Sequence, residues 1–216
     1  MSVEVKICGI TRSEDAETAL KAGAQYLGFI LYAKSPRKIS ITDAILISEN
    51  YADFSHSKVA VDVCPDLDKV RQMKEAGFDF FQFHFPLDFE TEKILQWSEL
   101  VSPSKLWLAP KLPPGSAFPE QLLDLAETFV MDAFSKDQFG GTGQTSDWDS
   151  FSKYQTLYSN HKWILAGGMG PENIGYAVQH LDLGFVDVNS AVETSPGIKN
   201  KDKIKNLFLR LQELEK

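Results

Sequence analysis

The sequence has little of several features that would assign it to a particular class of protein. Its 216 residues include only two cysteines, Cys8 and Cys64, too few for a disulfide framework. No apolar run approaches the ~20 residues that a membrane-spanning helix needs. The first residues also lack the basic segment and apolar stretch of a signal peptide. These absences predict a cytoplasmic protein with free thiols.

Positive charge is scarce as well. The chain has 22 Lys and Arg residues against 30 Asp and Glu residues, a formal net charge of -8 and a pI near 5.0. Nucleic acid is therefore a poor candidate for the main partner, because a phosphate backbone requires a basic footprint. A small anionic ligand remains compatible, since a few backbone N–H groups and one arginine can hold a phosphate. We expect a small-molecule ligand, with no nucleic-acid or membrane partner, and the oligomeric state stays open.

The main organisation of the chain is an alternation of short β-rich runs with helical patterns. Eight such pairs in 216 residues give about 27 residues for each unit, close to the ~30 residues of a βαβ unit. The predicted strands are Val3–Cys8, Tyr26–Leu31, Lys58–Val63, Phe80–Phe83, Leu106–Ala109, Phe129–Asp132, Trp163–Ala166 and Phe185–Val188. The predicted helices are Ser13–Lys21, Ile41–Asn50, Leu67–Glu75, Glu90–Ser98, a weak Glu120–Leu123, Trp148–Leu157, Pro171–Gln179 and Lys201–Leu214.

This alternation predicts a parallel sheet covered by helices. Eight units favour a (β/α)8 barrel that occupies residues 1–216 as a single domain. An open doubly wound sheet is the alternative, but no Gly-x-Gly-x-x-Gly follows an early strand. Thr11 and Glu14 have the spacing of a capping box for the first helix.

The active site of such a barrel lies at the carboxyl ends of its strands, where three reactive side chains are predicted to be. Cys8 ends the first strand beside Gly9, near a helix start that lowers the pKa of a thiol, although a lone cysteine is more often a buried core residue. Asp132 ends the sixth strand and suits a catalytic acid or a cap. Arg37 could bind a carboxylate through two hydrogen bonds, or it could be an ordinary surface arginine. The four histidines do not have the spacing of metal ligands, so we expect no metal.

Two loops have the composition of a phosphate site. Gly167 and Gly168 follow the seventh strand, and Asn189 and Ser190 precede a possible short helix, Ala191–Glu193. The loops after strands seven and eight often bind phosphate in this fold, through backbone N–H groups at a helix start. Tight turns that simply require glycine are the alternative interpretation.

Several motifs together resemble the phosphoribosylanthranilate isomerase family, over nearly the whole chain and in the same order. They are Lys6-Ile7-Cys8-Gly9-Ile10-Thr11, Gly28-Phe29-Ile30, Ser35-Pro36-Arg37, Gln82-Phe83-His84, Asp132 with Gly140-Gly141-Thr142-Gly143, Leu165-Ala166-Gly167-Gly168, Pro171-Glu172-Asn173, Val186-Asp187-Val188-Asn189-Ser190 and Val192-Glu193-Thr194-Ser195-Pro196-Gly197-Ile198-Lys199. The resemblance implies an Amadori rearrangement of N-(5′-phosphoribosyl)anthranilate in tryptophan biosynthesis, with no cofactor.

The resemblance also implies a role for each matching residue. Asp132 would be the acid that opens the ribose ring, and Cys8 would be the base. Arg37 would hold the anthranilate carboxylate. The implied substrate-binding residues are completed by Gly141, Thr142, Gly143, Gly167, Gly168, Asn189, Ser190 and Ala191.

The chain departs from the usual family motifs at five positions, which are Asp62, Cys64, Phe85, Asn189 and Ala191. Phe85 is predicted to narrow the mouth of the barrel, and Ala191 to fit only if its φ is negative. The alternative to an isomerase is therefore a diverged barrel that binds a sugar phosphate with little or no turnover.

Overall fold

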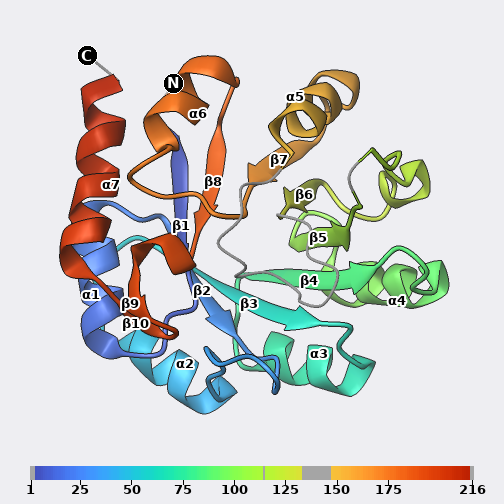
Figure 1. Ribbon diagram of the computed structural model, residues 1–216. Coiled ribbons are helices and arrows are strands. Elements are labelled where there is room, and N and C mark those ends of the chain that lie inside the picture. The colour runs from blue at the N-terminus through green and yellow to red at the C-terminus, as the bar shows by residue number, and fades with distance from the viewer. Residues whose placement is uncertain (1–2, 114, 133–146, 215–216) are drawn as a thin grey trace.

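The computed structural model describes residues 3–113, 115–132 and 147–214, and it contains a closed barrel of eight parallel strands in sequence order (Figure 1). The eight strands are β1 (Glu4–Cys8), β2 (Tyr26–Ile30), β3 (Ser57–Val63), β4 (Phe80–Pro86), β5 (Leu106–Lys111), β6 (Thr128–Met131), β7 (Lys162–Leu165) and β8 (Phe185–Val188). Pairing of β1 with β8 closes the barrel and places Lys6 opposite Asp187. The predicted fold class is confirmed.

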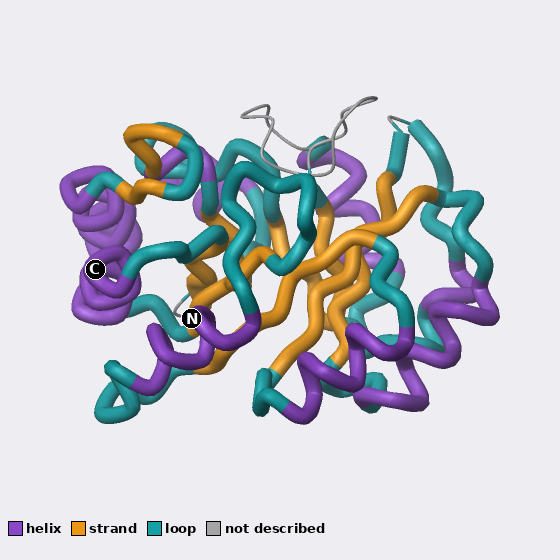
Figure 2. The backbone as a smooth tube through the Cα atoms, turned by 90° about the horizontal axis from the view of Figure 1, so that it is seen from below, coloured by secondary structure: helices purple, strands orange, loops and turns teal. Residues whose placement is uncertain are grey.

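Helices follow the strands and surround the barrel (Figure 1). They are α1 (Ser13–Ala22), α2 (Ile41–Glu49), α3 (Leu67–Glu75), α4 (Thr91–Val101), α5 (Trp148–Leu157), α6 (Ile174–His180) and α7 (Lys201–Leu214), with short 3-10 turns η1 (Glu120–Leu122) and η2 (Ser190–Val192). A small antiparallel hairpin, β9 (Glu193–Ser195) with β10 (Ile198–Lys199), precedes α7 and lies beside it at the upper left of Figure 2. None of the helices in the described residues has the length and apolar character that crossing a membrane requires.

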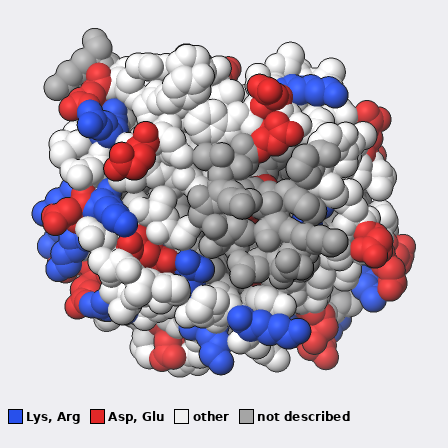
Figure 3. All heavy atoms as spheres, viewed as in Figure 1, with Lys and Arg blue, Asp and Glu red and all other residues white. Residues whose placement is uncertain are grey.

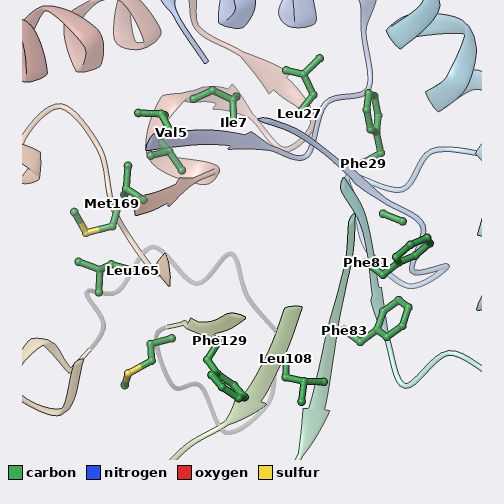
Figure 4. Packing of buried hydrophobic residues seen from close by; sticks show 14 of the residues in the cluster. Val5, Ile7, Leu27, Phe29, Phe81, Phe83, Leu108, Phe129, Leu165 and Met169 are labelled. Carbon is green, nitrogen blue, oxygen red and sulfur yellow. The ribbon is translucent and has the colours of Figure 1, made fainter. Parts of the chain in front are cut away.

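The alternation of side chains along each strand creates two separate apolar layers. One set of strand residues, including Ile7, Phe83 and Phe129, packs with the helices in the larger cluster. Figure 4 shows that the labelled side chains of this cluster point outward from the ring of strands. The other set, including Val61 and Trp107, fills the barrel interior. Because a strand turns successive side chains to opposite faces, each strand serves both layers.

The start of α1 differs from the predicted capping box. The helix begins at Ser13, with Arg12 at the N-cap and no side-chain cap. The hydroxyl of Thr11 instead donates a hydrogen bond of 2.5 Å to the carbonyl of Gly197, in the turn of the β9–β10 hairpin. The prediction was wrong because a long-range acceptor took the hydroxyl that a local cap would use. Thr11 therefore fastens the loop after β1 to the hairpin.

Other boundaries differ by a few residues. The seventh predicted helix was expected to begin at Pro171, but the corresponding helix α6 begins at Ile174 after a short turn. The weak helix predicted at 120–123 is the single 3-10 turn η1, so β5 and β6 are joined without an α-helix in the described residues. The short helix predicted at 191–193 is η2, which begins one residue earlier at Ser190.

Helix α7 allows a direct test of the outer layer. Leu207 is fully buried and Leu209, two residues later on the same helix, is 54% exposed. Leu207→Ala should lower the free energy of unfolding by about 2–5 kcal/mol, since it leaves a cavity between helix and barrel. Leu209→Ala is the matched control and should change it by less than about 0.5 kcal/mol. Equal losses in denaturant titrations would contradict this packing.

Candidate active site

A cavity of about 490 Å³ opens at the carboxyl ends of the barrel strands. Six of the residues predicted from the sequence line it, namely Cys8, Arg37, Asp132, Gly168, Asn189 and Ser190. The thiol and the carboxyl group that were predicted as base and acid therefore border the same space, although they come from β1 and from the residue after β6. In the space-filling view of Figure 3, charged side chains of both signs are interspersed around this face.

The remaining predicted residues have different positions. Gly141, Thr142 and Gly143 lie outside the described residues. Gly167 precedes the cavity-lining Gly168 without lining the cavity itself. Ala191 belongs to η2, directly after Ser190, and likewise does not line the cavity.

Cys8 is 4% exposed and is a free thiol at the end of β1. Burial raises the pKa of this thiol because it disfavours the charged thiolate. Lys6 and Lys199 act in the opposite direction, and Asp187 adds to the increase. The sequence led us to expect a lowered pKa from the nearby helix start, and that expectation was wrong, because desolvation outweighs the neighbouring positive charges.

Lys6 lies on the interior side of β1, two residues before Cys8, and is completely buried. Its Nζ donates hydrogen bonds of 2.7 Å to Asp187 Oδ2 and 2.7 Å to Gln82 Oε1. Burial alone would lower the pKa of Lys6, but the Asp187 carboxylate and the Cys8 group outweigh burial and raise it. The buried ammonium group is therefore held in its charged form.

His84 also borders the cavity, and its Nε2 lies 2.9 Å from the side-chain nitrogen of Gln82. Burial, with a further contribution from the positive charge of Lys6, lowers the pKa of His84 to about 4. A neutral imidazole therefore accepts a hydrogen bond from the Gln82 amide, whose oxygen accepts one from Lys6. Lys6, Gln82 and His84 form one continuous chain across the barrel interior.

Arg37 is held by a second buried cluster of charges. Its Nε donates to both oxygens of Glu193 at 3.0 Å, and its Nη2 donates to Oε2 at 2.8 Å. Lys199 Nζ donates to Glu193 Oε1 at 2.9 Å and to Asn189 Oδ1 at 2.9 Å. Arg37 is thus neither a plain surface residue nor free to move, since this cluster fixes it to the β9–β10 hairpin.

Gly9 lets Arg37 and Asn189 approach the backbone closely because it has no side chain. Its φ of +72° is in the left-handed region, and a Cβ there would lie 2.7 Å from Asn189 Oδ1 and 3.0 Å from Arg37 Cδ. Any side chain at this position would push both residues away. The glycine after Cys8 therefore lets the loops after β1, β2 and β8 meet at the cavity.

The two loops that were predicted to bind phosphate lie against each other. Asn173 Oδ1 accepts a hydrogen bond from Gly170 N, and its Nδ2 donates one to the carbonyl of Gly168. A Cβ on Gly170 would lie 2.5 Å from the Cβ of Ala191, so the β7 loop touches η2. In the described residues, Cys64 and Ser102 alone combine a side chain with positive φ. Ala191 therefore meets the condition of a negative φ.

Two of the departures from the family motifs lie in the helical layer. Phe85 is 2% exposed and packs against Phe89 and Trp97, with ring centroids 6.0 Å and 6.1 Å away. It does not narrow the cavity, so that prediction was wrong. Asp62 borders the cavity, but its Oδ2 forms an ion pair of 2.5 Å with Lys69 on α3.

Four residues of the site were not predicted from the sequence, namely Lys6, Gln82, Glu193 and Lys199. Lys6 and Gln82 could have been found from the alternation of strand side chains. Lys6 lies two residues from Cys8 and Gln82 two residues from His84, so each shares a strand face with a residue that lines the cavity. Nothing comparable identified Glu193 or Lys199, because their partners come from loops far away in the sequence. Among the described residues, no group of three or more His, Cys, Asp and Glu side chains is arranged to hold a metal.

A closed parallel barrel with a thiol and a carboxyl group facing one cavity defines the class of the protein, which is a (β/α)8-barrel enzyme. The family model described as "N-(5'phosphoribosyl)anthranilate (PRA) isomerase" matches residues 5–210. The N-(5'-phosphoribosyl)anthranilate isomerase of Aquifex aeolicus is 33% identical over 208 residues, which cover 96% of this chain and 98% of the relative. The chain therefore belongs to the phosphoribosylanthranilate isomerase family.

Solved structures agree with this assignment. The crystal structure of phosphoribosyl anthranilate isomerase from Thermus thermophilus has a TM-score of 0.82 and 34% identity, covering 98% of this chain and 100% of that one. A phosphoribosyl anthranilate isomerase in complex with reduced 1-(o-carboxyphenylamino)-1-deoxyribulose 5-phosphate has a TM-score of 0.75 and 28% identity, covering 98% and 99%.

The buried cluster around Glu193 predicts a specific dependence of stability on pH. Burial alone would raise the pKa of Glu193, but Arg37 and Lys199 outweigh burial and lower it below its ordinary value. Glu193→Gln leaves both cations without a counter-charge, so it should reduce the free energy of unfolding by about 3–5 kcal/mol near neutral pH. Because the folded pKa is depressed, this contribution is complete above the ordinary carboxyl pKa of ~4.3 and is lost as pH falls through the folded value.

Denaturant titrations of parent and variant at several pH values measure this difference. Glu213→Gln is the matched control, since Glu213 forms an exposed pair with Arg210 and should change stability very little. A Glu193→Gln penalty that stays constant down to strongly acidic pH would show that the carboxylate charge is not what stabilises the cluster.

Proposed function

We propose that this chain converts N-(5′-phosphoribosyl)anthranilate to 1-(2-carboxyphenylamino)-1-deoxyribulose 5-phosphate in tryptophan biosynthesis. Family membership supports this activity, as does the relative whose structure contains a reduced form of that product. The observation that carries the proposal is that Cys8 and Asp132 border one cavity, which also contains Arg37. One acid and one base suffice for an Amadori rearrangement, so the reaction requires neither a metal nor a cofactor.

The acid step is assigned to Asp132. Its carboxyl group gives a proton to the ribose ring oxygen, and the bond between that oxygen and C1′ breaks. The lone pair of the anthranilate nitrogen moves into the bond to C1′ and forms an iminium ion. Asp132 suits this step because it continues the interior-facing row of β6, one residue beyond Met131.

The base step is assigned to Cys8. The thiolate removes the proton from C2′, and the electrons of that C–H bond form a double bond between C1′ and C2′ while the iminium nitrogen becomes neutral. The enolamine then tautomerises to the ketone at C2′. A thiolate is a suitable base here because the iminium ion makes the C2′ proton acidic.

Arg37 is assigned to the anthranilate carboxylate. Its ion pair with Glu193 uses Nε and Nη2, so the Nη1 edge is the one to meet a ligand. A guanidinium group fixed in this way has little conformational entropy left to lose when it binds.

The phosphate is assigned to the loops after β7 and β8, around Gly168, Ser190 and Ala191. Gly167 and Gly168 have φ values of +82° and +65°, which glycine adopts readily. Bare backbone N–H groups at such turns bind anions without a basic surface. Gly141, Thr142, Gly143 and Asn189 are proposed to complete the substrate contacts.

Several further expectations belong to this proposal. Residues 1–216 form a single domain, the protein acts in the cytoplasm, and its ligand is a small phosphorylated molecule rather than nucleic acid. The acidic balance of the chain, with a formal net charge of -8, supports the last of these expectations.

Substitution of the two reactive groups tests the assignment. Cys8→Ser and Asp132→Asn should each lower turnover of freshly prepared phosphoribosylanthranilate by roughly 10²–10⁴-fold, the usual contribution of general acid or base catalysis. The loss of substrate fluorescence measures turnover, and product binding by calorimetry shows that the cavity remains intact. Normal turnover by either variant removes that residue from the mechanism. A parent protein that binds phosphate or product without turnover supports a ligand-binding barrel instead.

The pH dependence provides a second test. Because burial raises the pKa of the Cys8 thiol, little thiolate is present at neutral pH. The value of kcat/KM should therefore rise about tenfold for each pH unit from neutral pH up to the thiol pKa. Cys8→Asp supplies a carboxylate that is already charged at neutral pH, so its residual activity should lack this rise. A rise of equal slope in both proteins would assign the titration to another group.

A further inference from the structure

Lys6 has a position that the acid and base steps do not explain. It is a lysine with no exposed surface, and it lies inside the barrel on the same strand as Cys8, two residues earlier in the sequence. A buried ammonium group is costly unless it is paired and hydrogen-bonded. Two of its N–H groups are satisfied by Asp187 and Gln82, and an ammonium group has a third.

Gly28 on β2 shows how closely Lys6 and Cys8 approach. A Cβ on this glycine would lie 2.7 Å from Lys6 Cε and 2.8 Å from Cys8 Sγ. The end of the lysine chain and the sulfur atom thus lie over the same glycine, which has no side chain to separate them. Each residue also affects the pKa of the other, in the direction expected for an ammonium group beside a thiolate.

We propose that Lys6 is a positioning residue for the Cys8 base, whose ammonium group, fixed by Asp187 and Gln82, stabilises the thiolate that removes the C2′ proton. This inference rests on the proposed function of Cys8. It assigns to the buried Lys6–Asp187 pair a role in the reaction as well as in closing the barrel.

The charges around the sulfur determine the direction of the effect. Lys6 from β1 and Lys199 from β10 favour the thiolate, while Asp187 from β8 disfavours it. Gly28 from β2 contributes no charge, and His84 from β4, which faces the pair, is neutral at pH 7 because its pKa is about 4. The other oxygen of Asp187, Oδ1, is buried without a hydrogen-bond partner in the described residues. Lys6 is thus the counter-charge for two negative groups once the thiolate forms.

The thiol pKa can be measured without turnover. In a Cys64→Ser background, Cys8 is the single cysteine, and the pH dependence of its alkylation by iodoacetamide gives its pKa. Lys6→Met should raise that pKa by at least about one unit, the low end of the effect of an adjacent opposite charge. Alkylation and kcat/KM at neutral pH should both fall tenfold or more. Both should recover towards parent values at higher pH, which a merely structural defect would not allow.

Lys162→Met is the matched control. Lys162 also forms an ion pair with a carboxylate of β1, Glu4, at 2.6 Å, but both side chains are partly exposed and neither lines the cavity. This variant should leave the thiol pKa and kcat/KM unchanged. An identical thiol pKa in folded Lys6→Met and in the parent protein overturns the proposal, and so does an equal shift in Lys162→Met.

Two further variants keep the test decisive if Lys6→Met does not fold. Asp187→Asn should lower the thiol pKa, and Lys6→Met combined with Asp187→Asn should have a higher thiol pKa than Asp187→Asn alone. Equal values in those two proteins contradict the role of Lys6. Failure of the proposed function is distinguishable, because it would be seen as full turnover by Cys8→Ser whatever the alkylation shows.

Discussion

Closure of the barrel between β1 and β8 is the constraint on which the rest of the structure depends. The register of this strand pair places Lys6 opposite Asp187. Their ion pair of 2.7 Å joins the first and the last strand inside the barrel. Because both residues of the pair are buried, a shift of register by one residue would leave two unpaired charges in the interior. The same register places Cys8 at the rim of the cavity. The structural and the chemical roles of β1 therefore cannot be separated.

A second buried cluster of charges holds the loops at the cavity together, as the pairing of β1 with β8 holds the strands together. Arg37, Glu193 and Lys199 come from the loop after β2 and from the β9–β10 hairpin, and Thr11 joins the loop after β1 to the same hairpin. Loops at the end of a barrel have few apolar contacts to fix them. Charged hydrogen bonds with fixed geometry can take that function, at the cost of desolvating each group. The hairpin thus orders the side of the cavity on which Arg37 lies.

The sequence predicted what depends on local periodicity. Eight strand and helix patterns implied the barrel, and the rule that strand ends carry the site led to Cys8 and Asp132. Features that depend on contacts across the fold were missed or misassigned. Thr11 had the right spacing for a cap, yet its hydroxyl bonds to Gly197, far away in the chain. The thiol pKa was expected to fall near a helix start, but burial raises it, and burial is a property of the whole barrel.

Two of the positions where the chain departs from the usual family motifs, Asp62 and Phe85, contact the helices outside the barrel. Phe85 packs with Trp97 between β4 and α4, and the Asp62 carboxylate is turned towards Lys69 on α3. Both side chains contact helices that cover the barrel, while the interior-facing residues of the same strands, Val61 and His84, border the cavity. Alternating side chains let one strand diverge on its outer face without altering its inner face. Divergence at Phe85 is therefore no argument for a lost activity, because this side chain packs against α4 and does not line the cavity. Asp62 does border the cavity, but its carboxylate is paired with Lys69 on α3.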